Sequence, residues 1–116
     1  MLNDIAIEAF NTRTSVNVNN IKTMTVSELD RIKTHGMEAE ALMRNRSLVL
    51  FIHQSKFDIS DQLAAILGHS EEDNNRRIAL SNQLAGLEKF VDTLKQAVYY
   101  RNLVVKQQTA PADVNP

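Results

Sequence analysis

Two groups of arginine and asparagine carry the side chains best suited to chemistry in this sequence. The first group is Arg44, Asn45 and Arg46, and the second is Asn74, Asn75, Arg76 and Arg77. Guanidinium groups beside the N-terminus of a helix bind phosphate or carboxylate through charge-assisted hydrogen bonds. If two helices fold back around residues 56–69, both groups lie near that turn and form an anion site. The favoured alternative is that the arginines pair with the acidic residues 71–73, or cover apolar area with their stems.

A second candidate site combines aromatic and polar side chains at residues 99–102. Tyr99 and Tyr100 stand there beside Arg101 and Asn102. An aromatic pair with arginine and asparagine can stack on and hydrogen-bond a planar ligand such as a nucleobase. At helical spacing such side chains more often form the rim of a helix interface, and this alternative is favoured.

Residues 94–102, with the sequence LKQAVYYRN, resemble the closing helix of phage cyclic-nucleotide sponges. Those are small helical-hairpin proteins that assemble as oligomers and sequester nucleotides of defence signalling. The resemblance rests on a leucine, an alanine, a valine, an aromatic residue and an asparagine in the same order. The preceding stretch departs from the pattern, and this chain is longer in the middle. The resemblance implies an oligomer that sequesters a nucleotide-type ligand.

The sequence contains no arrangement typical of a catalytic site. The histidines His35, His53 and His69 have no further His, Cys or carboxylate at metal-ligand spacing, and cysteine is absent. A glycine-rich phosphate loop and a nucleophile elbow are also missing. We therefore expect a protein that is not an enzyme and needs neither metal nor cofactor.

Composition narrows the classes of partner. The 116 residues carry a formal net charge of −1, so the basic excess typical of nucleic-acid binding is missing. No apolar run approaches the ~20 residues of a membrane span, and the N-terminus lacks the features of a signal peptide. We expect a single soluble, cytoplasmic domain that binds neither nucleic acid nor membrane.

A heptad seam in the second half of the chain predicts how these residues are positioned. Its members, three or four residues apart, are Leu80, Leu84, Leu87, Val91, Leu94 and Val98. Such a seam is typical of a helix packed lengthwise against another helix. Ser70 is a suitable N-cap before three acidic residues, so we expect a helix from about residue 70 to about residue 107. Arg101 interrupts the seam, and we expect the packing to end or change partner there.

A second long helix is predicted to follow a capping box at residues 25–28. Gly36 and Arg46 occupy seam positions of this helix, and the heptad phase points Arg46 inward. For Gly36, a tolerated glycine is slightly favoured over a kink or a close crossing with another helix. The apolar run 48–52 fits either a buried strand or a helix, and we choose helix because no comparable strand exists to pair with it.

A turn and a short helix are predicted between the two long helices. Residues 55–58 form the turn, and Asp58 or Ser60 caps a short helix that continues to Leu67. Gly68 then closes this helix as a left-handed residue.

Together these elements predict an all-α fold: an elongated antiparallel helical hairpin with a short intervening helix and an N-terminal arm. Residues 1–24 form the arm and a loop, 25–108 the hairpin domain, and 109–116 a disordered tail. Docking of the arm on its own subunit is favoured over packing on a neighbouring subunit.

Apolar side chains cover more than one stripe of the predicted hairpin, so we expect a homo-oligomer, most simply a dimer that forms a four-helix bundle. The expected oligomer or partner interface comprises the seam residues together with Val49, Phe51 and Ile52.

Three functions remain open. The first is a non-catalytic interaction protein, an assembly factor, chaperone or inhibitor that binds a protein partner through helix–helix contacts. The second is an oligomeric nucleotide-sequestering protein, in which the arginines hold an anionic group and the tyrosines stack on a ring. The third is a purely structural oligomeric scaffold.

Overall fold

The computed structural model describes residues 1–13 and 16–109, all in helices or short connections, with no strand among them. Its elements are α1 (Leu2–Thr12), the 3-10 helix η1 (Val18–Thr23), α2 (Val26–Arg44), α3 (Arg46–Ala65) and α4 (Glu71–Thr109). The predicted all-α fold is confirmed. The molecule is elongated, with extents of 70 × 38 × 28 Å, and the tail predicted for 109–116 lies outside the described residues apart from Thr109.

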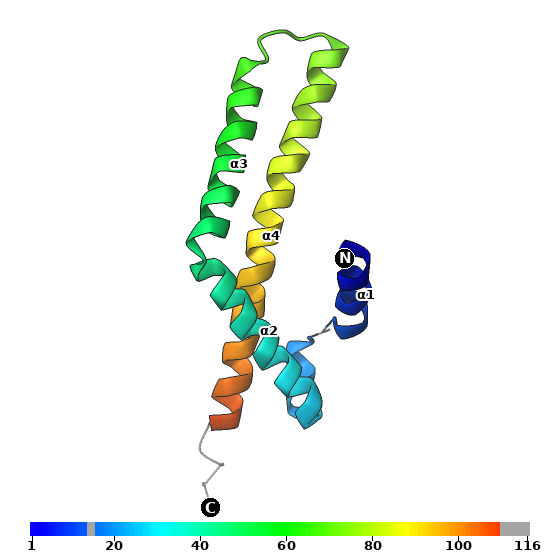
Figure 1. The fold of residues 1–116 in the computed structure, drawn as a ribbon, viewed down its shortest axis with the longest axis vertical. Helices are drawn as coiled ribbons and strands as arrows, with labels where there is room; N and C mark the ends of the chain where they lie inside the picture. The colour runs from blue at the N-terminus through cyan, green and yellow to red at the C-terminus, as the bar shows by residue number, and fades with distance from the viewer. Residues whose placement is uncertain (14–15, 110–116) are drawn as a thin grey trace, which may run out of the picture.

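The 39-residue helix α4 is the longest element of the fold, and both α2 and α3 pack against it. α3 runs antiparallel beside its N-terminal half, and α2 crosses its C-terminal half (Figure 1). The predicted seam faces this hairpin: Leu80 and Leu94 are buried, and the four seam residues Leu84, Leu87, Val91 and Val98 are half-buried. Residues 48–52 are helical, as predicted.

The break between the helices lies at Asn45, and the prediction of a turn at residues 55–58 is wrong. The Asn45 amide donates to the Leu42 carbonyl (3.1 Å), and its side-chain oxygen accepts from the Leu48 amide (3.0 Å). Asn45 therefore ends α2 and caps α3. α3 continues unbroken through residues 55–58, so no separate short helix follows. The break also interrupts the heptad phase, and Arg46, predicted to point inward, is exposed.

The connection between α3 and α4 depends on side-chain hydrogen bonds. Ser70 caps α4 as predicted: its hydroxyl accepts from the Asp73 amide (3.1 Å), and the Asp73 carboxylate accepts from the Ser70 amide (3.3 Å). Arg77 donates to the carbonyl oxygens of Ile66 and Gly68. The prediction that Gly68 closes the helix as a left-handed residue is wrong: α3 ends at Ala65, and no described glycine has a positive φ. The side-chain contacts hold the loop instead.

The buried core is thin and divides into two clusters along α4. Ile21 of η1 packs with Ile32 of α2 and Val104 of α4, and Val104 is fully buried. Further along, Ala39 packs with residues 94 and 97 of α4. α1 has no buried residue and stands apart from the hairpin in Figure 1. α1 is therefore not docked on its own subunit in the isolated chain, whereas η1, which follows it within residues 1–24, contributes Ile21 to the core.

None of the described helices is long and apolar enough to cross a membrane.

Candidate functional site

The crossing of α2 and α4 is closest at Gly36. A Cβ added to Gly36 would lie 2.7 Å from the Ala97 carbonyl oxygen and would overlap the Arg101 side chain. Gly36 is buried, so the backbones approach where a larger residue would hold them apart. The slightly favoured interpretation, a merely tolerated glycine, is wrong, and the close crossing considered beside it is correct.

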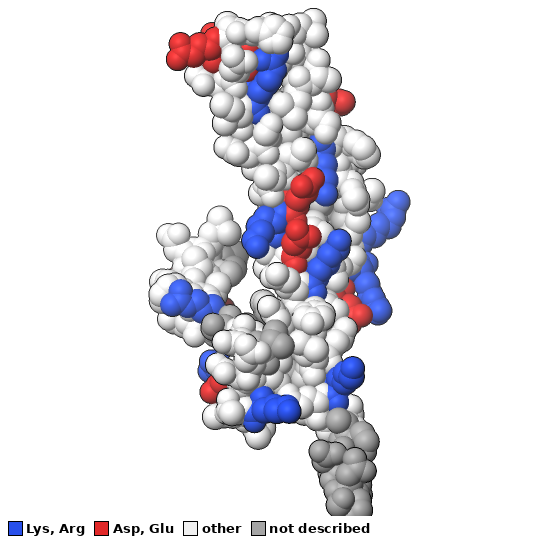
Figure 2. Space-filling model, turned by 180° about the vertical axis from the view of Figure 1, so that it is seen from behind, with Lys and Arg blue, Asp and Glu red and all other residues white. Residues whose placement is uncertain are grey.

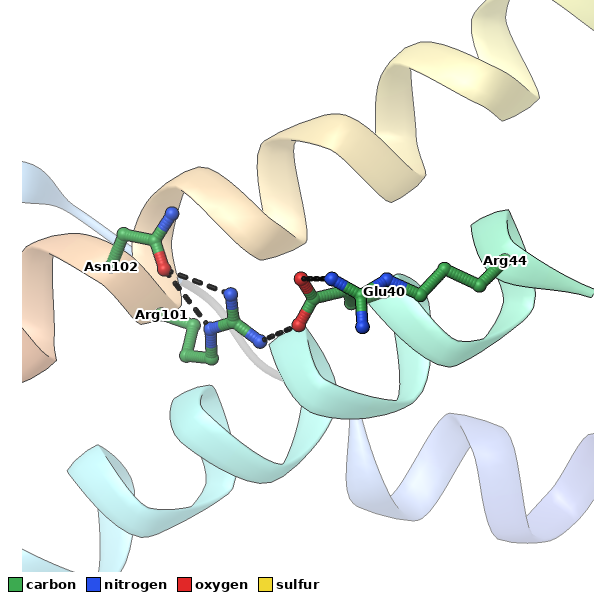
Figure 3. Close-up of polar contacts among 4 residues, drawn as sticks. All are labelled: Glu40, Arg44, Arg101 and Asn102. Carbon is green, nitrogen blue, oxygen red and sulfur yellow. Dashed lines mark hydrogen bonds and ion pairs between the residues drawn. The ribbon is translucent and has the colours of Figure 1, made fainter.

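A polar cluster lies beside this crossing, built around Glu40 (Figure 3). Arg101 of α4 donates to Glu40 Oε2 at 2.5 Å, and Arg44 donates to Glu40 Oε1 at 3.2 Å. The Asn102 side-chain oxygen accepts from Arg101 Nε (3.1 Å) and Nη2 (2.9 Å). The hydrogen bond and charge of Arg101 hold the pKa of Glu40 below its ordinary value.

The packing of α4 against α2 does not end at Arg101, because this residue takes part in it. Its side chain is only 15 % exposed and is bound to Glu40 across the helix pair. Val104, one turn further on, is buried in the core. Sequence reasoning missed Glu40, although its place one turn after Gly36 puts a carboxylate on the face of α2 that meets α4.

The tyrosines predicted to stack on a ligand have different surroundings. Their rings meet edge to face with centroids 5.7 Å apart. Tyr100 is half-buried and packs against the core cluster of Ile21, Ile32 and Val104, whereas Tyr99 is 56 % exposed. With Arg101 and Asn102 bonded to each other, this arrangement resembles the rim of a helix interface, which was the favoured alternative.

The two arginine groups are not brought together within one chain. Arg44 is the last residue of α2, just before α3 begins, and Arg76 lies beside the end of α3, where it donates to Gln62 (3.2 Å). The 20 residues of α3 separate the groups by about 30 Å. Arg77 is engaged with the loop carbonyls and with Asn74 (2.8 Å). The condition for a shared anion site, that both groups meet at the turn, is thus not fulfilled in a single chain.

Large apolar side chains remain exposed on α3 and α4. Phe51 and Phe57 of α3 are 70 % and 68 % exposed, and Ile78 of α4 is 60 % exposed. Of the other residues predicted for an interface, Val49 and Ile52 are half-buried between the helices, as are most seam residues. On the face shown in Figure 2, acidic and basic side chains mark the hairpin tip, a mostly uncharged stretch follows it, and most of the charged side chains lie in the middle of the molecule.

An apolar groove of 300 Å³ lies where α2, α3 and α4 meet. It is lined by Leu42, Met43, Val49, Ile52, Val91 and Leu94, and Lys56 and Lys95 also border it. This groove was not predicted from the sequence, because it depends on the break at Asn45 that redirects α2 across α4.

No protein family matches this chain, and comparisons with curated proteins and with solved structures also give no match. Among the described residues, no group of three or more His, Asp or Glu side chains is placed to hold a metal ion.

Proposed function

We propose that this protein is a non-catalytic interaction protein that binds a protein partner through helix–helix contacts. The observation that carries the proposal is the set of large apolar side chains left in solvent on the α3–α4 hairpin. Phe51, Phe57 and Ile78 each expose more than half of their surface. A large exposed apolar area on one pair of helices is typical of interaction sites.

The spacing of the aromatic residues indicates how such a partner binds. Phe51 and Phe57 are six residues apart on α3, which at about 100° per residue places them about 120° apart around the helix. The buried residue Ile59 marks the side of α3 that faces α4. Phe57 lies about 160° from Ile59 and Phe51 about 80° from it, so the apolar anchors cover the outer side and one flank of α3. This arrangement suits packing against helices of a partner.

A matched pair of double variants tests the proposal. Phe51→Glu with Phe57→Glu removes both anchors, and Gln54→Glu with Ser60→Glu adds the same charge at exposed polar positions of the same helix. Tagged full-length chains are captured from the native cells, and bound proteins are quantified by mass spectrometry. We expect a partner that is retained by the wild type and the polar control and lost from the aromatic variant.

Identical captured proteins for all three chains would contradict the proposal. Loss of self-association alone, without loss of any other protein, would favour the purely structural scaffold. Circular dichroism of the variants verifies that the helices persist, because these substitutions are at exposed positions outside the seam.

A further inference from the structure

α1 is an amphipathic helix whose apolar side is left in solvent. Leu2, Ile5 and Phe10 recur at helical spacing on one side of α1, and each is more than half exposed. Glu8 and Thr12 line an open groove of 670 Å³ between α1 and α2, and Ile5 lies on the edge of the apolar side nearest to them. In the isolated chain Leu2, Ile5 and Phe10 nevertheless all remain exposed, so the apolar side of α1 has no cover from its own hairpin.

The apolar groove at the junction of α2, α3 and α4 is complementary to this helix. Its lining is aliphatic, with Leu42 and Met43 from α2, Val49 and Ile52 from α3, and Val91 from α4. Helix-in-groove recognition uses apolar anchors at positions i, i+3, i+4 and i+7 of the docked helix. In α1 this pattern is met by Leu2, Ile5, Ala6 and Ala9.

The arm of the same chain leaves the hairpin on the side of α4 that faces away from the groove. Val16, which follows the arm, lines a small cavity with Thr93 and Tyr100 of α4. Tyr100 and the groove residue Val91 are nine residues apart, or about two and a half helical turns, so they point to opposite sides of α4. α1 of a second copy can reach the groove without passing around α4.

We infer that α1 of one copy docks in the α2–α3–α4 groove of a second copy, and that the exchange is reciprocal. A two-fold dimer satisfies this arrangement because each copy supplies one arm and one groove. The inference does not depend on the proposed function, since Phe51 and Phe57 do not line the groove.

The exposed area of the chain fits this dimer. Its accessible surface is 9170 Å² for a mass of 13.1 kDa, whereas a compact monomer of this mass exposes about 6400 Å². The surplus of about 2800 Å² per copy, or about 5600 Å² for two copies, is at the upper end of the total area that obligate homodimers bury.

The charges favour the same occupant. α1 carries Asp4 and Glu8 and no Lys or Arg, and Lys56 and Lys95 border the groove. The acidic side chains lie on the outer side of the docked arm, about a helix diameter from the lysines, so their attraction is modest and screened by salt. An amphipathic helix that binds anionic lipid instead carries basic residues on its polar face.

The dimer is tested first by charge placement on the arm. Ile5→Glu with Phe10→Glu disrupts the apolar side, and Asn3→Glu with Asn11→Glu adds equal charge to exposed polar positions. Sedimentation equilibrium of the full chain measures the dimer dissociation constant. We expect it to rise by about 100-fold or more in the apolar variant, because two buried anchors are lost, and by less than about tenfold in the control. A monomeric wild type, or equal effects of the two variants, would overturn the inference.

Cross-linking then decides which copy supplies the arm. The chain has no cysteine, so one copy can carry Ala9→Cys alone and another His53→Cys alone, and a short bis-maleimide joins them only between copies. We expect the mixed product at the groove and none when Asn75→Cys replaces His53→Cys at the hairpin tip. A bridge formed only within a chain that carries both cysteines would show that α1 docks on its own subunit. If neither bridge forms, α1 does not bind in the groove. Both results overturn the inference.

Discussion

At the scale of single residues, two glycines in helices have opposite surroundings and predict opposite effects of the same substitution. At Gly36 an alanine Cβ would meet the Ala97 carbonyl oxygen at 2.7 Å, whereas at Gly86 nothing lies within 4 Å. We expect Gly36→Ala to lower the free energy of unfolding by about 1–3 kcal/mol through overpacking. Gly86→Ala should raise it by about 1 kcal/mol through helix propensity. Urea unfolding of both variants measures these changes, and equal stabilisation would show that the helices do not cross closely.

Glu40 predicts a pH dependence of stability. Because Arg101 holds the pKa of Glu40 below its ordinary value of 4.5, the pair stabilises the fold above that value, and its contribution is lost as the pH falls through the lowered pKa. We expect Glu40→Gln to lower the unfolding temperature at pH 7, with a difference from wild type that shrinks as the pH falls below 4.5.

The exposed Glu38 of the same helix provides the control for this prediction. Glu38→Gln should leave both the unfolding temperature and its pH dependence close to wild type. Thermal unfolding followed by circular dichroism from pH 2 to pH 8 measures all three chains. An equal loss for Glu40→Gln over the whole range from pH 2 to pH 8 would show that its effect does not come from the ionised pair.

At the scale of elements, the Asn45 cap decides where α2 ends and α3 begins. Asn45→Ala removes the hydrogen bond from the Leu48 amide and should lower the free energy of unfolding by about 1 kcal/mol. Hydrogen exchange of the amides in the first turn of α3 should accelerate in the variant. Asn75→Ala, at an exposed position inside α4, is the control: it should raise the free energy of unfolding slightly through helix propensity and leave exchange in the first turn of α3 unchanged. Unchanged exchange in the first turn of α3 would mean that packing against α4 alone holds the helix start.

The helices were predicted correctly where the sequence pattern that specifies them lies within a few neighbouring residues. The seam from Leu80 to Val98 and the Ser70 cap depend on spacing and on short-range hydrogen bonds, and both predictions are confirmed. The break at Asn45 was missed because the apolar run that follows it continues a helical pattern in either case. The Glu40–Arg101 pair was missed because the register between α2 and α4 is set by the crossing at Gly36, which the sequence marks only with a glycine.

At the scale of the whole molecule, the thin core and large surface imply that folding and association are linked. The Cα radius of gyration is 19.8 Å, while a compact chain of this length has about 13 Å. A chain that leaves Phe51, Phe57 and the apolar side of α1 in water gains much of its apolar burial from other molecules.

Linkage then predicts that stability rises with protein concentration. A reaction that binds the folded state only, here a second copy, raises the unfolding temperature by mass action. We expect the wild-type unfolding midpoint to increase steadily over a hundredfold range of concentration, and the midpoint of the Ile5→Glu, Phe10→Glu variant to remain nearly constant. Differential scanning fluorimetry with an external dye, needed because the chain lacks tryptophan, measures both. A wild-type midpoint independent of concentration would mean that the elongated hairpin is stable alone, and that its apolar surface is kept free for a different protein.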